Sequence, residues 1–355
     1  MIHIDGSYGE GGGQILRTSL SIAAITGKPI TINNIRAKRK KPGLAAQHLT
    51  GVRAAAKICN ADLQGDALGS TMLQFTPQTA VQSGNYIFDV TEASLGGSAG
   101  SVALVLQTIL LPLALANNDS QVILRGGTHV SYSPAIAYIE QVYLPMLRRM
   151  GINAEIKLNA WGWYPQGGGE VELRVKGHTG QLRGINIIER GDLQQVEGIA
   201  VVTELPANIP QRMLNRAVNL LHAEDIKTNI IPLRAKGIAP GAGLFLTAVY
   251  ENSLAGFGAL GRLGLTSEKV AEIACEEFLK FHQTSAPIDE HLADQLLLPA
   301  VLAAEASQYR VAEVTLHLTT NAWVIEQFGL AQVDIEDENI VKVQVRDLLL
   351  LGQRG

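Results

Sequence analysis

The chain has 355 residues, 46% of them hydrophobic and 17% charged, with a formal net charge of −4. This composition provides a large core, excludes extended disorder and leaves a local basic patch as the only form of a polyanion site. The longest apolar run, 108–116, is too short to span a membrane, and Cys59 and Cys275 give neither a disulfide framework nor a thiolate metal site. The chain enters a strand from Met1 without a signal peptide, so we expect a soluble cytoplasmic protein.

The first notable element is a glycine-rich turn, Gly9-Glu10-Gly11-Gly12-Gly13, which leads into an apolar helix that begins near Gln14 and carries Arg17. Glycines allow a close approach of the backbone to a ligand, and a helix start offers free N–H groups to phosphate. Glu10 can hold a divalent cation there, and Arg17 adds positive charge. The spacing matches neither the P-loop nor the dinucleotide fingerprint. A plain surface hairpin turn is the alternative.

A basic segment follows the next predicted strand, with five Lys or Arg residues in the six positions 36–41. If the first strands pair locally, this segment lies near the glycine-rich turn. The next predicted helix lies within 42–61 and begins near Gln47 and His48, which add hydrogen-bonding groups close to the same place. Lys and Arg here suit the phosphates of RNA or a nucleotide, although a solvated cationic loop explains the same residues.

Three further glycine segments lie at 96–101, 126–129 and 164–170. The first resembles the glycine-rich turn, because it also lies before a glutamine, Gln107, and an apolar helical stretch. The other two follow or precede predicted strands. We interpret the segments as lining one shared crevice, with close packing of helix on sheet as the alternative.

The sequence contains an internal repeat. Glutamines 14, 107 and 295 each precede an apolar helical stretch, a break and a β-rich strand, at 30–32, 122–124 and 311–318. Second helices are predicted at 42–61, 133–150 and 321–328. Repeated strands and helices indicate a mixed α/β architecture. Residues 184–265 do not match, so we predict repeats one and two over 1–183, an inserted α/β domain over 184–265, repeat three over 266–345 and a tail over 346–355.

Two histidines lie in suggestive patterns. His291 and Asp294 share a helix face in the segment 290–295, which is a weak metal-site signal. In 314–320, apolar residues alternate with Thr315, His317 and Thr319, which predicts a strand with His317 on its polar face and Thr320 as the cap of the next helix. His317 is a candidate base, metal ligand or nucleophile, or a satisfied polar residue.

Together these motifs resemble the RNA 3′-terminal phosphate cyclase family. The matching segments run in family order from the start to about Phe328 and are 5–6, 9–17, 35–37, 41–44, 47–49, 97–101, 106–108, 164–169, 292–296 and 317–321. The resemblance implies an α/β (α+β) fold of three βαβαββ-like units, each like the C-terminal domain of a translation initiation factor, plus a small inserted domain.

The resemblance also implies a reaction. ATP adenylylates an enzyme histidine and releases pyrophosphate, AMP passes to an RNA 3′-terminal phosphate, and the neighbouring 2′-hydroxyl displaces AMP to give a 2′,3′-cyclic phosphate. The implied cofactors are ATP and Mg²⁺ or Mn²⁺, and the implied partner is RNA with a 3′-phosphate.

By position, the resemblance makes His317 the nucleophile and Glu10 the metal ligand. It makes the following residues contacts of ATP, its phosphates or the adenylate: Gln107, His291, Leu292, Ala293, Asp294, Gln295, Arg17, Arg36, Arg39, Gln47 and His48. One departure is His291, where family members can carry Tyr, so we expect stacking or hydrogen bonding there. A non-catalytic relative in ribosome assembly and an enolpyruvyl-transferase-like enzyme are the alternatives. The RNA, the preferred metal, the role of the inserted domain and the oligomeric state stay open.

Overall fold

The computed structural model describes residues 1–93, 99–178 and 180–345. The predicted tail 346–355 and residues 96–98 of the glycine segment 96–101 therefore lie outside the described residues.

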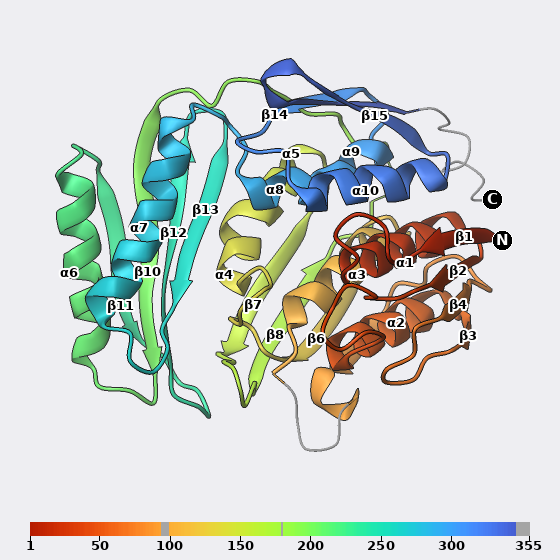
Figure 1. The fold of residues 1–355 in the computed structure, drawn as a ribbon, viewed down its shortest axis with the longest axis horizontal. Coiled ribbons are helices and arrows are strands. Elements are labelled where there is room, and N and C mark those ends of the chain that lie inside the picture. Colours follow the sequence, from red (N-terminus) through yellow and green to blue (C-terminus); the bar gives the residue numbers. More distant parts are fainter. Residues whose placement is uncertain (94–98, 179, 346–355) are drawn as a thin grey trace.

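Three four-stranded sheets share one pairing pattern (Figure 1). The first has the order β1-β2-β4-β3, from β1 (Ile2–Asp5), β2 (Ile30–Asn33), β3 (Asp62–Gln64) and β4 (Leu73–Thr76). The second has the order β5-β6-β8-β7, from β5 (Asn85–Asp89), β6 (Ser120–Gly126), β7 (Ala154–Ala160) and β8 (Gly169–Val175). The third has the order β9-β14-β16-β15, from β9 (Asn186–Ile187), β14 (Ser307–Arg310), β15 (Ala331–Glu336) and β16 (Ile340–Val345). In each sheet the first two strands are parallel and the other pairs antiparallel.

Helical segments accompany each sheet. The first unit has α1 (Gln14–Thr26) and α2 (Ala46–Cys59). The second has η1 (Val90–Ala93), α3 (Val102–Ala114) and a continuous run of α4 (Ile136–Tyr138), η2 (Ile139–Tyr143) and α5 (Leu144–Arg149). The third has α8 (Glu290–Gln295), α9 (Leu297–Leu302), α10 (Leu316–Gln327) and η3 (Asp337–Asn339). Helix α1 packs against α2, α3 and α10, so the helices meet in one apolar core. This arrangement confirms the predicted mixed α/β fold.

An inserted unit lies between β9 and α8. Its sheet has the order β11-β10-β12-β13, and α6 and α7 cover one face (Figure 1). The elements are β10 (Leu193–Thr203), α6 (Asn208–His222), β11 (Thr228–Arg234), β12 (Gly241–Tyr250), β13 (Leu254–Leu260) and α7 (Ser267–Gln283). The unit has its own hydrophobic core. Because α7 packs on this sheet whereas β9 pairs with β14, we propose unit boundaries near 193 and 283, in place of 184 and 265.

Two details of the predicted repeats are wrong. No strand covers 311–318, because β14 ends at Arg310, before this range, and helix α10 begins at Leu316. The alternation misled because Leu316 is 64% exposed and does not face a core. Gln107 lies inside α3 and does not precede that helix, whereas Gln295 ends α8 directly before the apolar helix α9. Within the described chain, no helix combines the length and apolar character that crossing a membrane requires.

Candidate active site

The glycine-rich turn 9–13 joins β1 to α1 and lies beside the basic segment, as predicted. The parallel pairing of β1 with β2 brings the two segments together. Lys38 Nζ donates to the Gly9 carbonyl at 2.8 Å, and Arg39 forms an ion pair with Glu10. Gly9 has a φ of 51°, in the left-handed region that favours glycine, and a Cβ on this residue would overlap Thr320 Oγ1. The turn is therefore shaped by contacts with both the basic segment and α10.

Glu10 is the only carboxylate within this turn, and its side chain is 13% exposed. Its amide donates to Thr320 Oγ1 at 3.3 Å, which ties the turn to α10. Its Oε2 atom is buried, has no hydrogen-bond partner among the described residues and lies 3.6 Å from His317 Nδ1. A buried carboxylate oxygen without a partner is costly, so it fits a ligand position for a cation.

His317 lies in the first turn of α10, so the structure corrects its predicted place on a strand. Thr315 Oγ1 accepts the Leu318 N–H at 3.1 Å, which makes Thr315 the N-cap; Thr320, the predicted cap, lies within the helix. The His317 side chain is 48% exposed. Partial burial, followed by the positive charges of Arg17 and Arg39, lowers the pKa of His317. The imidazole is therefore neutral at neutral pH, which is the form that acts as a nucleophile.

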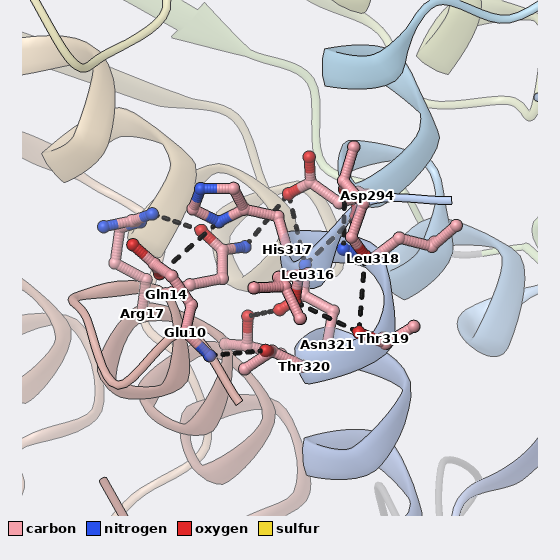
Figure 2. Close-up of polar contacts among 12 residues, drawn as sticks. Glu10, Gln14, Arg17, Asp294, Leu316, His317, Leu318, Thr319, Thr320 and Asn321 are labelled. Carbon is pink, nitrogen blue, oxygen red and sulfur yellow. Dashed lines mark hydrogen bonds and ion pairs between the residues drawn. The ribbon is translucent and has the colours of Figure 1, made fainter. Parts of the chain in front are cut away.

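A hydrogen-bond network around Asp294 joins α1, α8 and α10 (Figure 2). Gln14 Nε2 donates to Asp294 Oδ2 at 3.2 Å, and Asn321 Nδ2 donates to the same atom at 3.3 Å. Thr18 donates to Asn321 Oδ1 at 2.6 Å, and Arg17 donates to Gln14 Oε1. Sequence reasoning did not assign roles to Gln14, Thr18 or Asn321. The sequence feature that could have identified them is a polar side chain within an otherwise apolar helix.

Burial tunes the charges of this network. It raises the pKa of Asp294 to about 7, against the opposing effect of Arg17 and His291. Burial also lowers the pKa of Arg17 to about 10, so the guanidinium keeps its charge at neutral pH. The site therefore combines a fixed positive charge with a carboxyl group that titrates near neutrality.

Among the remaining predicted residues of the first two units, His48 lies against the same turn. Burial, then Arg36, Arg17 and Arg39, lowers the pKa of His48 to about 3, and this neutral ring packs against Gly13. Arg36 donates to the Gly43 carbonyl at 2.7 Å. Gln47 Oε1 accepts the Ser101 N–H at 2.8 Å and thereby links the first unit to the second. Gln107 lies on α3 beside these helices.

The residues of α8 divide into two groups. The His291 side chain is 65% exposed and Asp294 reaches the network, whereas Leu292 and Ala293 are fully buried in the core. Gln295 is also buried, and its Oε1 atom has no hydrogen-bond partner in the described structure. Direct contacts of Leu292 and Ala293 with ATP remain a prediction.

The glycine segments at 126–129 and 164–170 adjoin the inserted unit. His129 stacks on Trp161, with ring centroids 4.3 Å apart, and contacts Phe245 of β12. A Cβ on Gly168 would overlap Ile238. These two segments therefore contact the inserted unit, whereas the turn 9–13 contacts α10.

A metal ion would have few protein ligands here. Within residues 1–93, 99–178 and 180–345, no group of three or more His, Cys, Asp or Glu side chains could hold one. Mg²⁺ commonly binds through one or two carboxylates plus substrate phosphates and water. The unpartnered oxygen of Glu10 fits that kind of site.

The family model and the curated relatives point to one family. The family model for RNA 3′-terminal phosphate cyclase matches residues 8–335. A protein of that name from Nostoc sp. is 68% identical over 97% of this chain and 99% of its own length. Relatives of the same name from Methylococcus capsulatus and Archaeoglobus fulgidus are 54% and 40% identical, over 94% and 96% of this chain and 93% and 99% of their own. A solved structure, the enolpyruvyl transferase NikO from Streptomyces tendae, aligns with 97% of this chain and 81% of its own at 11% identity and a TM-score of 0.24, which carries no inference.

Proposed function

The chain belongs to the RNA 3′-terminal phosphate cyclase family, an enzyme family, and we propose that it converts an RNA 3′-terminal phosphate to a 2′,3′-cyclic phosphate at the expense of ATP. The observation that carries this proposal is the approach of His317 Nδ1 to Glu10 Oε2, at 3.6 Å, beside Arg17 and Arg39. A neutral nucleophile, a free carboxylate oxygen and fixed positive charge meet there.

In the first proposed step, His317 attacks the α-phosphorus of ATP. Because Nδ1 faces Glu10, Nε2 is the nitrogen left to attack. A P–N bond forms, the bond between the α-phosphorus and its bridging oxygen breaks, and pyrophosphate leaves while the imidazole loses its proton to water. Arg17, Arg36 and Arg39 offset the charge on the phosphates. A divalent ion bound to Glu10 would add electrostatic stabilisation of those phosphates.

In the later steps, a 3′-phosphate oxygen of the RNA attacks the phosphorus of the bound AMP, the P–N bond to His317 breaks, and the imidazole takes a proton from water as it leaves. The neighbouring 2′-hydroxyl then attacks the activated phosphorus and loses its proton, and AMP departs as the ring closes. Gln47, His48, Gln107 and the segment 291–295 hold ATP and the adenylate in this proposal. Adenylylation makes the steps possible because AMP is a far better leaving group than oxide.

The test is incubation of the protein with α-labelled ATP and magnesium. We expect a covalent protein–AMP adduct that is lost in His317→Ala and His317→Asn and retained in His291→Ala. Adding an oligonucleotide with a 3′-phosphate should discharge the adduct and give a phosphatase-resistant end. A folded wild-type protein that forms no adduct would contradict the proposal. Formation of the adduct would separate the proposal from the non-catalytic and enolpyruvyl-transferase alternatives, because neither requires a protein–AMP intermediate. A cytoplasmic location remains part of the proposal.

A further inference from the structure

Asp289 is a buried carboxylate that no step of the proposed reaction uses. It is 2% exposed and immediately precedes α8. Its Oδ1 atom accepts the N–H groups of His291 and Leu292 at 2.9 and 2.8 Å. The Tyr138 hydroxyl donates to both carboxylate oxygens, at 2.9 and 3.1 Å, and the Gly256 N–H donates to Oδ2 at 3.2 Å.

These donors come from three different units of the fold. His291 and Leu292 belong to α8 of the third unit, Tyr138 ends α4 of the second, and Gly256 lies in β13 of the inserted unit. Tyr138 is held between the other groups, since a Cβ on Gly256 would overlap its ring. Burial, followed by the charge of Asp289, raises the pKa of Tyr138 well above its usual value, so the hydroxyl remains a donor.

An ordinary helix cap does not require a buried carboxylate that accepts hydrogen bonds from three units of the fold. One oxygen of Ser, Thr or Asn satisfies the first amides of a helix, and a buried charge is costly unless several donors compensate it. Here one oxygen caps α8 while the second is directed at a strand of another unit. Helix α8 carries both His291 and Asp294, and Asp294 accepts hydrogen bonds from Gln14 and Asn321. The carboxylate therefore joins the inserted unit to the candidate active site.

We propose that Asp289 is a positioning residue through which the docked inserted unit fixes the orientation of α8. The inserted unit thereby helps to set the ATP-binding geometry. The kinetic effects of this role rest on the proposed function. The orientation of α8 itself can be measured without substrate.

Three variants separate the cap from the link. Asp289→Asn keeps Oδ1 as the cap but places an amide opposite the Gly256 N–H. Tyr138→Phe removes one donor. Gly256→Ala, which lies within the inserted unit, pushes the Tyr138 ring away from Asp289. Arg212→Ala is the control, because it breaks an exposed ion pair with Glu268 on the same unit.

Hydrogen exchange of the α8 amides is the first readout. We expect each of the three variants to raise exchange in 290–296 about ten-fold, while exchange in α1 and the second sheet stays the same. Adduct formation is the second readout. We expect the KM for ATP to rise roughly ten-fold with kcat nearly unchanged, because His317 on α10 is untouched. Arg212→Ala should change neither.

Unchanged exchange in α8 would overturn the inference, as would a rise spread over the whole chain, which indicates general destabilisation. A change in kcat alone would also contradict it. If the wild-type protein forms no adduct, the proposed function fails, and exchange in α8 still decides the role of Asp289.

Discussion

At the scale of single residues, Glu10 shows how the glycines around it act. A Cβ on Gly12 would overlap both Glu10 carboxylate oxygens and the Arg39 guanidinium, so the bare glycine leaves room for the ion pair. The ion pair engages Oε1 and leaves Oε2 without a hydrogen-bond partner in the described structure. The turn thus holds a carboxylate that is half satisfied and fixed in direction.

Replacing Glu10 by Gln keeps the side-chain shape and removes the charge. We expect the magnesium concentration for half-maximal adduct formation to rise roughly ten-fold or more, because the proposed ligand loses its charge. A titration of adduct formation with Mg²⁺ measures this. Glu326→Gln, on the exposed side of α10, is the control. An unchanged magnesium demand would remove Glu10 from the proposed metal site.

Some residue contacts were predictable and others were not. The approach of the basic segment to Glu10 followed from the pairing of two strands that are adjacent in the chain. The role of Asp289 did not, because its partners Tyr138 and Gly256 lie 151 and 33 residues away along the chain. Nothing in the local sequence distinguishes this aspartate from an ordinary cap.

At the scale of elements, α10 determines where His317 lies. The N-cap Thr315 fixes the first helical turn, and Asn321, one turn later, donates to Asp294. The six alternating residues 314–319 predicted a strand, but a period of two over so short a window also fits the start of a helix after its cap. The function assigned to His317 did not depend on that error, since the surrounding residues carried the resemblance.

Loss of the α10 cap should therefore affect chemistry as well as stability. We expect Thr315→Ala to cost about 0.5–2 kcal/mol of stability and to slow adduct formation, because the first turn that carries His317 frays. Thr315→Ser should restore both.

Thr266→Ala is the matched control. Thr266 caps α7 by accepting the Lys269 N–H at 3.2 Å, and α7 carries no proposed site residue. Its removal should cost similar stability and leave the adduct rate unchanged. Urea unfolding and rapid-quench labelling provide the two measurements, and equal adduct rates in Thr315→Ala and the wild type would contradict the prediction.

At the scale of the molecule, three sheets surround helices that meet in one core, and the inserted unit docks beside them (Figure 1). The internal repeat of glutamine, apolar helix and strand predicted this arrangement of units, although it placed Gln107 before its helix and not inside it. The contact of the inserted unit was not predictable, because the aromatic cluster of His129, Trp161, Trp163 and Phe245 joins side chains from separate segments. Only the tertiary fold brings these rings together.

Phe245→Ala tests that contact. The change opens a cavity between the inserted unit and the second unit, with an expected cost of about 3–5 kcal/mol and a urea midpoint lowered by about 1 M or more. Ile231→Ala, at an exposed position on β11, should move the midpoint little. Equal midpoints for the two variants would show that the aromatic cluster does not stabilise the molecule.

The bond between Glu10 and Thr320 spans 310 residues of sequence. At the usual pace of synthesis, about 5–20 residues per second, the N-terminal turn waits roughly 15–60 s before its C-terminal partner is made. A chain that stops before α10 therefore lacks His317, the histidine whose Nδ1 lies 3.6 Å from Glu10 Oε2. Under the proposed reaction, adenylylation requires a chain that extends through α10, so chains that stop before His317 would not consume ATP.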